Sequence, residues 1–164
     1  MRRNPLSTIR SCYDFVGRAR LQLDMAAFAT LPLHALPSPC RAFLYAALQL
    51  NRGRNDHALS FARKAKEEIV EVEELAYVLF VEGMALLTSG RQEEAIAVYK
   101  TCEDLCRSSG DKGLRFDALL LLCSIYMALG EPEMARPYEK EAALIMPRRL
   151  LGKRKNKKGG QTPR

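Results

Sequence analysis

An all-α fold of stacked helix pairs is predicted by three observations on the sequence. Apolar residues recur at the i, i+3, i+4, i+7 spacing of a helix, as at Leu119, Leu122, Cys123 and Tyr126. Three apolar segments each end at a glycine corner, at Gly53, Gly90 and Gly130. Small residues stand five and twelve positions after each glycine: Ala58, Ala65, Ala95, Cys102, Ala135 and Ala142. Because small side chains let helices approach closely, these positions predict tight antiparallel pairs.

The repeated unit resembles the tetratricopeptide repeat (TPR), a helix-turn-helix motif with a period of about 34 residues. The corner glycines are 37 and 40 residues apart, so the chain is similar to a long-period variant of that family. The resemblance implies a right-handed α-solenoid of about three TPR-like helix pairs, preceded by a degenerate helix pair. The aromatic residue that usually opens the motif is replaced by Ala42, Leu79 and Leu119.

Residues 1–37 are predicted to form N-terminal capping helices. Ser7 and Asp24 are suitable N-cap residues, and residues 7–31 are interpreted as the degenerate pair. Apolar residues at Ile9, Tyr13 and Val16 follow helical spacing. A mitochondrial presequence is the alternative, because the chain is basic and carries no acid before Asp14.

Residues 38–147 are predicted to form the repeat domain, in units spanning 38–70, 72–108 and 113–147. A loop is expected at 107–115, where the sequence RSSGDKGLR is rich in Gly and Ser. Residues 148–164 form a basic tail without apolar periodicity, which we expect to be disordered.

Charge is distributed unevenly along the 164 residues. The net charge is +7, yet residues 148–164 alone carry eight Lys or Arg, and residues 21–147 have a net charge of −5. The sequence contains no run of 18 apolar residues, so no membrane insertion is expected. Five scattered cysteines predict free thiols in a reducing compartment, with the cytoplasm expected and the nucleus or mitochondrion as alternatives.

Motifs of catalytic sites are absent from the sequence. It has no GK[ST] phosphate loop, no HExxH and no GxSxG. The two histidines lie near none of the helical cysteines in sequence, which argues against a zinc site. We therefore predict that the protein is not an enzyme and holds no cofactor or metal.

The TPR resemblance implies a concave groove, lined by the first helix of each pair, that binds a peptide or amphipathic helix of a partner protein. Carrying the family's groove positions onto this sequence gives Phe43, Leu50, Asn51, Tyr77, Phe80, Met84, Thr88, Leu120, Ser124 and Met127. The alternative is that some of them are core residues or are covered by the N-terminal helices. TPR domains that clamp a terminal carboxylate use Lys and Asn at such positions, and only Asn51 fits that mode.

The function predicted from these features is a non-catalytic protein-interaction module: a scaffold, an adaptor or a chaperone. The chain is loosely similar to small bacterial secretion chaperones with TPR-like units. The alternative is a nucleic-acid-associated or nuclear protein acting through Lys153, Arg154, Lys155, Lys157 and Lys158. Self-association is also expected at the uncapped C-terminal end, through Leu144, Ile145, Leu150 and Leu151.

Overall fold

The computed structural model describes residues 6–145, and this part of the chain is helical without any strand. Its α-helices are α1 (Ile9–Phe15), α2 (Met25–Ala29), α3 (Ser38–Asn51), α4 (Asn55–Glu68), α5 (Val72–Thr88), α6 (Gln92–Ser109), α7 (Lys112–Ala128) and α8 (Pro132–Ile145). Short 3-10 turns lie at Arg18–Arg20 and Leu33–Ala35. The predicted basic tail 148–164, with its five candidate nucleic-acid residues, and Leu150 and Leu151 lie outside the described residues.

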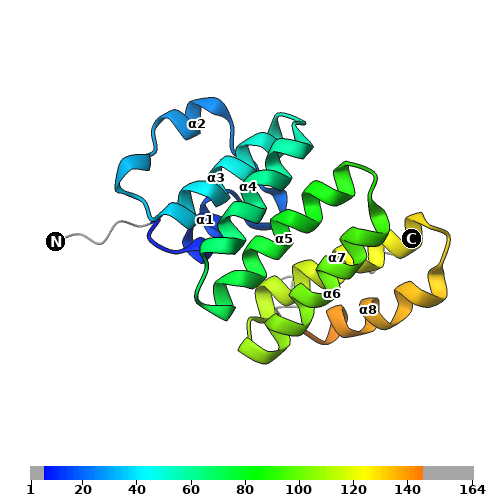
Figure 1. The fold of residues 1–164 in the computed structure, drawn as a ribbon. Helices are drawn as coiled ribbons and strands as arrows, with labels where there is room; N and C mark the ends of the chain where they lie inside the picture. The colour runs from blue at the N-terminus through cyan, green and yellow to red at the C-terminus, as the bar shows by residue number, and fades with distance from the viewer. Residues whose placement is uncertain (1–5, 146–164) are drawn as a thin grey trace, which may run out of the picture.

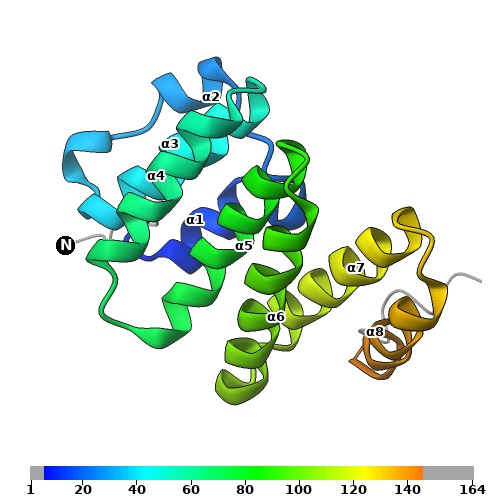
Figure 2. The same cartoon turned by 45° about the vertical axis from the view of Figure 1, so that its right-hand side comes forward.

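The three predicted units are helix pairs that stack in chain order. α3 pairs with α4, α5 with α6, and α7 with α8, while α4 packs on α5 and α6 packs on α7 (Figure 1). In Figure 2 the pairs follow one another from upper left to lower right as a curved stack. The predicted fold class, an all-α solenoid of TPR-like helix pairs, is confirmed.

The corner glycines turn the chain between the two helices of each pair. Gly53, Gly90 and Gly130 have φ of 68°, 76° and 75°, the left-handed region that side chains other than glycine rarely adopt. The residue after each glycine donates its N–H to the carbonyl five residues back, as from Arg91 to Leu86 at 2.9 Å. This hydrogen bond closes the C-terminus of the first helix and starts the next one.

The loop expected at 107–115 is much shorter than predicted. α6 continues to Ser109 and α7 begins at Lys112, so only Gly110 and Asp111 join them. Gly110 takes a φ of 77°, and the Asp111 side chain caps α7 by accepting the Leu114 N–H at 3.0 Å. The short polar side chains that suggested a loop are instead satisfied within α6, where Ser108 donates to the Asp104 carbonyl at 3.0 Å.

Small residues lie where the helices cross, as predicted. Those at the fixed distances from the corner glycines are 0–2% exposed: Ala58, Ala65, Ala95, Cys102, Ala135 and Ala142. In the central pair, the fully buried Tyr99 of α6 lies against Gly83 of α5. Its ring also meets that of Phe80 edge-on, with centroids 5.6 Å apart.

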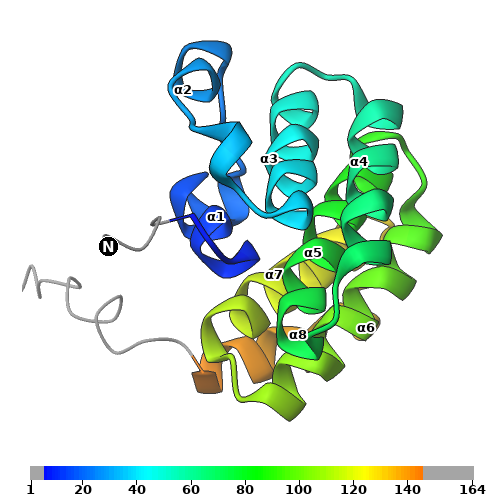
Figure 3. The same ribbon diagram turned by 60° about the vertical axis from the view of Figure 1, so that its left-hand side comes forward.

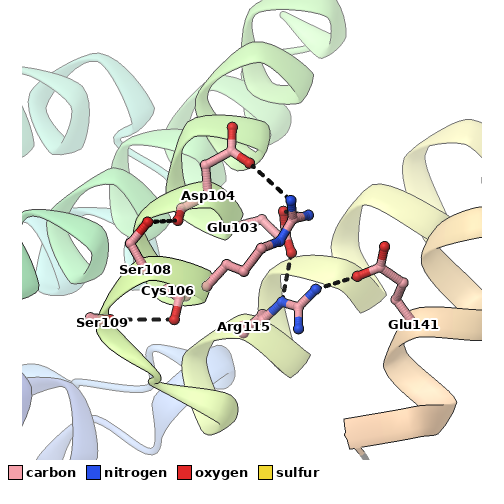
Figure 4. A network of polar contacts seen from close by, with 8 residues as sticks. Glu103, Asp104, Cys106, Ser108, Ser109, Arg115 and Glu141 are labelled. Carbon is pink, nitrogen blue, oxygen red and sulfur yellow. Dashed lines mark hydrogen bonds and ion pairs between the residues drawn. The ribbon is translucent and has the colours of Figure 1, made fainter.

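Two buried carboxylates connect neighbouring helix pairs. Glu82 of α5 pairs with Lys66 of α4 at 2.7 Å and with Arg63 at 3.4 Å. Glu103 of α6 accepts Arg107 at 2.7 Å and Arg115 of α7 at 2.6 Å. Arg115 also pairs with Glu141, so this network joins α6, α7 and α8 (Figure 4).

The N-terminal segment contacts the array on two different surfaces. α2 covers the flank of the first pair, where Phe28, Tyr45 and Phe61 form a ladder with ring centroids 4.9 and 5.1 Å apart. α1 lies against α3 and α5, on the side turned away from α4 and α6 (Figure 3). The side expected to form the groove is therefore partly occupied by the chain itself.

Candidate functional site

The concave side of the array holds α1, whose apolar face is fully buried there. Ile9, Cys12, Tyr13 and Val16 are at most 1% exposed. The Tyr13 ring lies between two aromatic rings of α5, with centroids 5.2 Å from Tyr77 and 5.4 Å from Phe80. The groove side therefore accommodates an amphipathic helix.

Cys12 also faces α3. Its thiol donates to the Leu6 carbonyl at 3.8 Å, and the neighbouring Cys40 thiol together with burial raises the pKa of Cys12. Both thiols are free, as are those of Cys102, Cys106 and Cys123.

Three polar contacts hold α1 to carboxylates of the array. The backbone N–H of Ile9 donates to Oε1 of Glu74 at 3.0 Å. The Tyr13 hydroxyl donates to Oδ2 of Asp117 on α7 at 3.0 Å, and Nη2 of Arg18 contacts the same oxygen at 3.0 Å. Burial raises the pKa of Glu74 despite the hydrogen bond from Ile9, which lowers it. Asp117 therefore fixes α1 by two donors, whereas the Glu74 carboxyl accepts one and is partly desolvated.

A charged cavity of about 590 Å³ runs beside α1, between the start of α5 and the turn that joins α6 to α7. It is lined by charges of both signs: Arg10, Asp14, Arg18, Glu71, Glu73, Glu74, Asp111 and Lys112. The Tyr77 hydroxyl donates to Asp111 at its wall. Burial would raise the pKa of Asp111, but the hydrogen bonds from Tyr77 and the Leu114 N–H, with the nearby Arg10 and Arg18, lower it overall.

The predicted groove residues fall into three groups by burial. Phe43, Tyr77 and Phe80 are buried, and α1 covers the two aromatic residues of α5 through Tyr13. Leu50 and Met84 are half-buried against the core. The remaining five are exposed: Asn51, Thr88, Leu120, Ser124 and Met127. Phe43, Tyr77 and Phe80 are thus core residues or are covered by the N-terminal segment, as the alternative prediction states. The binding role of the whole set stays a prediction.

The exposed section continues along one face of α7. Leu120, Ser124 and Met127 follow Asp117 by three, seven and ten residues, so all four share a face of the helix. Asp117 contacts α1, whereas Leu120 and Met127 are 46% and 57% exposed. The surface occupied by α1 therefore continues onto uncovered apolar side chains of the third pair.

Comparison with known families matches one stretch of the chain. Residues 76–109, from within α5 to the end of α6, match the family model described as tetratricopeptide repeat. The chain contains a tetratricopeptide repeat. Gly83, Ala95 and Tyr99 stand at the glycine, alanine and aromatic positions of that motif, and Glu82 stands where the motif has Leu. No curated protein and no solved structure matches this chain.

The repeat makes the protein an interaction module in general terms, since TPR proteins act by binding other proteins along their curved surfaces. None of the helices in residues 6–145 is long and apolar enough to cross a membrane. Within the same residues, no three His, Cys, Asp or Glu side chains gather as they would around a metal ion.

Sequence reasoning did not assign Tyr13 or Glu74 to the site. The stripe of Ile9, Tyr13 and Val16 predicts a capping helix, and cover of the groove by the N-terminal helices is predicted only as an alternative. The TPR resemblance also implies a groove position for Asp117, but its partner is not predictable from the sequence because Tyr13 lies 104 residues away in the chain.

Proposed function

We propose that the protein binds a helix or peptide of a partner protein on its concave side, as a scaffold, adaptor or chaperone. The observation that carries this proposal is α1 itself, because an amphipathic helix already lies there with Ile9, Tyr13 and Val16 fully buried. A groove that takes one helix in this way has the width and apolar floor needed for another.

The uncovered section on α7 supports the same proposal. Leu120 and Met127 are large apolar side chains exposed on the face that begins at Asp117. Methionine adapts its shape to different apolar partners, and aromatic or aliphatic anchors contribute most of the binding energy at such surfaces. The section therefore suits the apolar face of a partner's helix.

Other parts of the sequence-based interpretation stay predictions. They are the non-enzymatic nature of the protein, its cytoplasmic location, nucleic-acid binding by the basic tail, and self-association near Leu144, which is 85% exposed.

The test compares two charge substitutions at equally exposed apolar positions. Leu120→Glu alters the α7 face, and Met134→Glu alters α8, where Met134 is 48% exposed and Leu120 46%. Each tagged full-length variant is used to capture partners from an extract of the source cells, with the melting temperature measured in parallel. We expect partners of the unchanged chain to remain bound to Met134→Glu and to be lost from Leu120→Glu. Equal capture by both folded variants would refute the concave side as the binding surface.

A further inference from the structure

We propose that α1 is an exchangeable occupant of the concave groove, and that an amphipathic helix of the partner protein with the same side-chain arrangement takes its place. The proposal rests on the proposed function and deepens it: it specifies which kind of helix the groove accepts and what competes with that helix.

The contacts of α1 define the helix that fits. Ile9, Cys12, Tyr13 and Val16 occupy positions i, i+3, i+4 and i+7 and are buried. The aromatic residue at i+4 is the one that lies between Tyr77 and Phe80 and reaches Asp117 with its hydroxyl. A matching partner helix has apolar residues at the other three positions.

Charge complementarity adds a basic residue to this pattern. Arg18, at position i+9, pairs with Asp117, and its guanidinium lies 5.9 Å from the Tyr13 ring centroid. The carboxylates of Glu74 and Asp111 border the same region, and Glu74 accepts the N–H at the beginning of α1. The groove therefore favours a helix that presents N–H donors at its start and a cation beyond its end.

Several features of the segment favour its release. α1 has seven residues, fewer than an isolated helix needs to be stable. The chain leaves it through Arg18 and Leu21, whose φ values of 56° and 47° are unfavourable for residues with side chains. The cavity beside α1 leaves one flank of the helix open, where Arg10 and Asp14 are exposed. Release would relax the backbone and rehydrate Glu74.

The uncovered face of α7 gives a partner an advantage over α1. α1 ends at Phe15 and leaves Leu120 and Met127 exposed, although they share a helix face with Asp117. A partner that engages both the α1 site and this section makes apolar contacts that α1 does not make. It can therefore displace an internal competitor that is always present.

The test uses a labelled synthetic peptide spanning residues 6–20 as the probe, and fluorescence anisotropy as the measurement. The peptide is added to the full-length chain and to a release variant, Ile9→Asp with Val16→Asp, which leaves every groove residue in place. A control peptide carries Ser in place of Ile9, Tyr13 and Val16. We expect the release variant to bind the probe at least about tenfold more tightly than the unchanged chain does, and not to bind the control peptide.

Three results would overturn the proposal. Equal binding to both proteins would mean that α1 does not compete. Absence of binding to the release variant, folded by circular dichroism, would mean that the groove accepts no helix in trans. A dimer with exchanged α1, detected by light scattering for the unchanged chain, would identify a second copy as the occupant. In each case the Leu120→Glu comparison still reports on the proposed function independently, because it does not involve α1.

Hydrogen exchange on the unaltered chain keeps the proposal testable if the release variant does not fold. We expect amides of α1 to exchange by local opening at least about a hundredfold faster than those of α5, as for segments of low local stability. Exchange of α1 only together with α5, by global unfolding, would show that α1 is an integral part of the core and would overturn the proposal.

Discussion

The contact between Gly83 and Tyr99 predicts that Gly83→Ala destabilises the protein, although alanine is the better helix former. An added Cβ would lie 2.7 Å from Cζ and 2.8 Å from Cε1 of Tyr99. Carbon atoms in favourable contact are about 3.5–4.0 Å apart, so the ring would have to move by about 1 Å. Tyr99 is fully buried and packs edge-on against Phe80, which leaves it little room.

The expected magnitude follows from two opposing terms. Overpacking of a well-packed core costs about 1–3 kcal/mol, and replacing an interior helical glycine by alanine recovers about 1 kcal/mol. Because the contact is far below the normal distance, we expect a net loss of about 1–2 kcal/mol. In a chain of this size that lowers the melting temperature by roughly 2–8 °C. Urea denaturation measures the change in the free energy of unfolding, and calorimetry measures the change in the melting temperature.

Gly113→Ala is the matched control, and a double mutant identifies the cause. A Cβ at Gly113 would meet Nη2 of Arg18 at 2.7 Å, but that guanidinium ends a flexible, half-exposed side chain and can move aside. We expect its effect to stay within about 0.5 kcal/mol. In a Tyr99→Leu background the cost of Gly83→Ala should disappear, a coupling of about 1–2 kcal/mol. Equal effects of the two glycine substitutions, or an unchanged cost in that background, would refute the reasoning.

Two further predictions concern buried tyrosines. The Tyr99 hydroxyl is buried without a hydrogen-bond partner in the described part of the chain, so Tyr99→Phe should raise the free energy of unfolding by about 1 kcal/mol; a loss of stability in urea would contradict this. Burial and the neighbouring Asp117 raise the pKa of Tyr13 above its usual value of about 10, so the stability it contributes is complete below pH 10 and is lost as the pH rises further. The urea midpoint should therefore fall more steeply between pH 10 and about pH 12 for the unchanged chain than for Tyr13→Phe, and parallel curves would count against that assignment.

The repeat array could be predicted because its determinants are local and recur. A corner glycine, a small residue five positions later and an apolar stripe before it specify one helix pair each time, as at Gly90 and Ala95. The unit boundaries agree with the helices to within a few residues because no distant residue is needed to form a pair. The loop at 107–115 was misjudged since Ser and Asp suit both a loop and a helix end.

The occupant of the groove could not be predicted from the same kind of signal. The stripe on α1 is equally suited to pairing with a neighbouring helix and to lying on the array. Its actual position depends on Tyr13 reaching Asp117 and on Ile9 reaching Glu74, which are contacts between residues distant in sequence. The burial of Glu82 could not be predicted either. This acid stands at the motif's Leu position, and its burial depends on ion pairs with Lys66 and Arg63 of the preceding helix pair.

The last prediction concerns Arg115, which attaches the terminal pair to the rest of the array. It pairs with the buried Glu103 on one side and with Glu141 on the other, and its side chain is 18% exposed (Figure 4). Arg115→Ala leaves the Glu103 carboxylate with only Arg107, whose side chain is 55% exposed.

Removing one partner of a buried pair costs about 3–5 kcal/mol, and the remaining Arg107 should reduce this to about 2–3 kcal/mol. Arg136→Ala is the control, since Arg136 pairs with Glu133 on the exposed surface of α8, where such pairs contribute about 0–1 kcal/mol.

Hydrogen exchange shows which helices lose stability in Arg115→Ala and how large the loss is. The main packing contact of α8 is with α7. Loss of Arg115 should therefore increase hydrogen exchange in α8 more than in α5. The exposed face of Leu120 and Met127 lies on α7, so a loosened terminal pair should also weaken partner capture, while Arg136→Ala should leave it unchanged. If Arg115→Ala and Arg136→Ala had equal effects on stability, the buried network would not be what connects the third pair to the second.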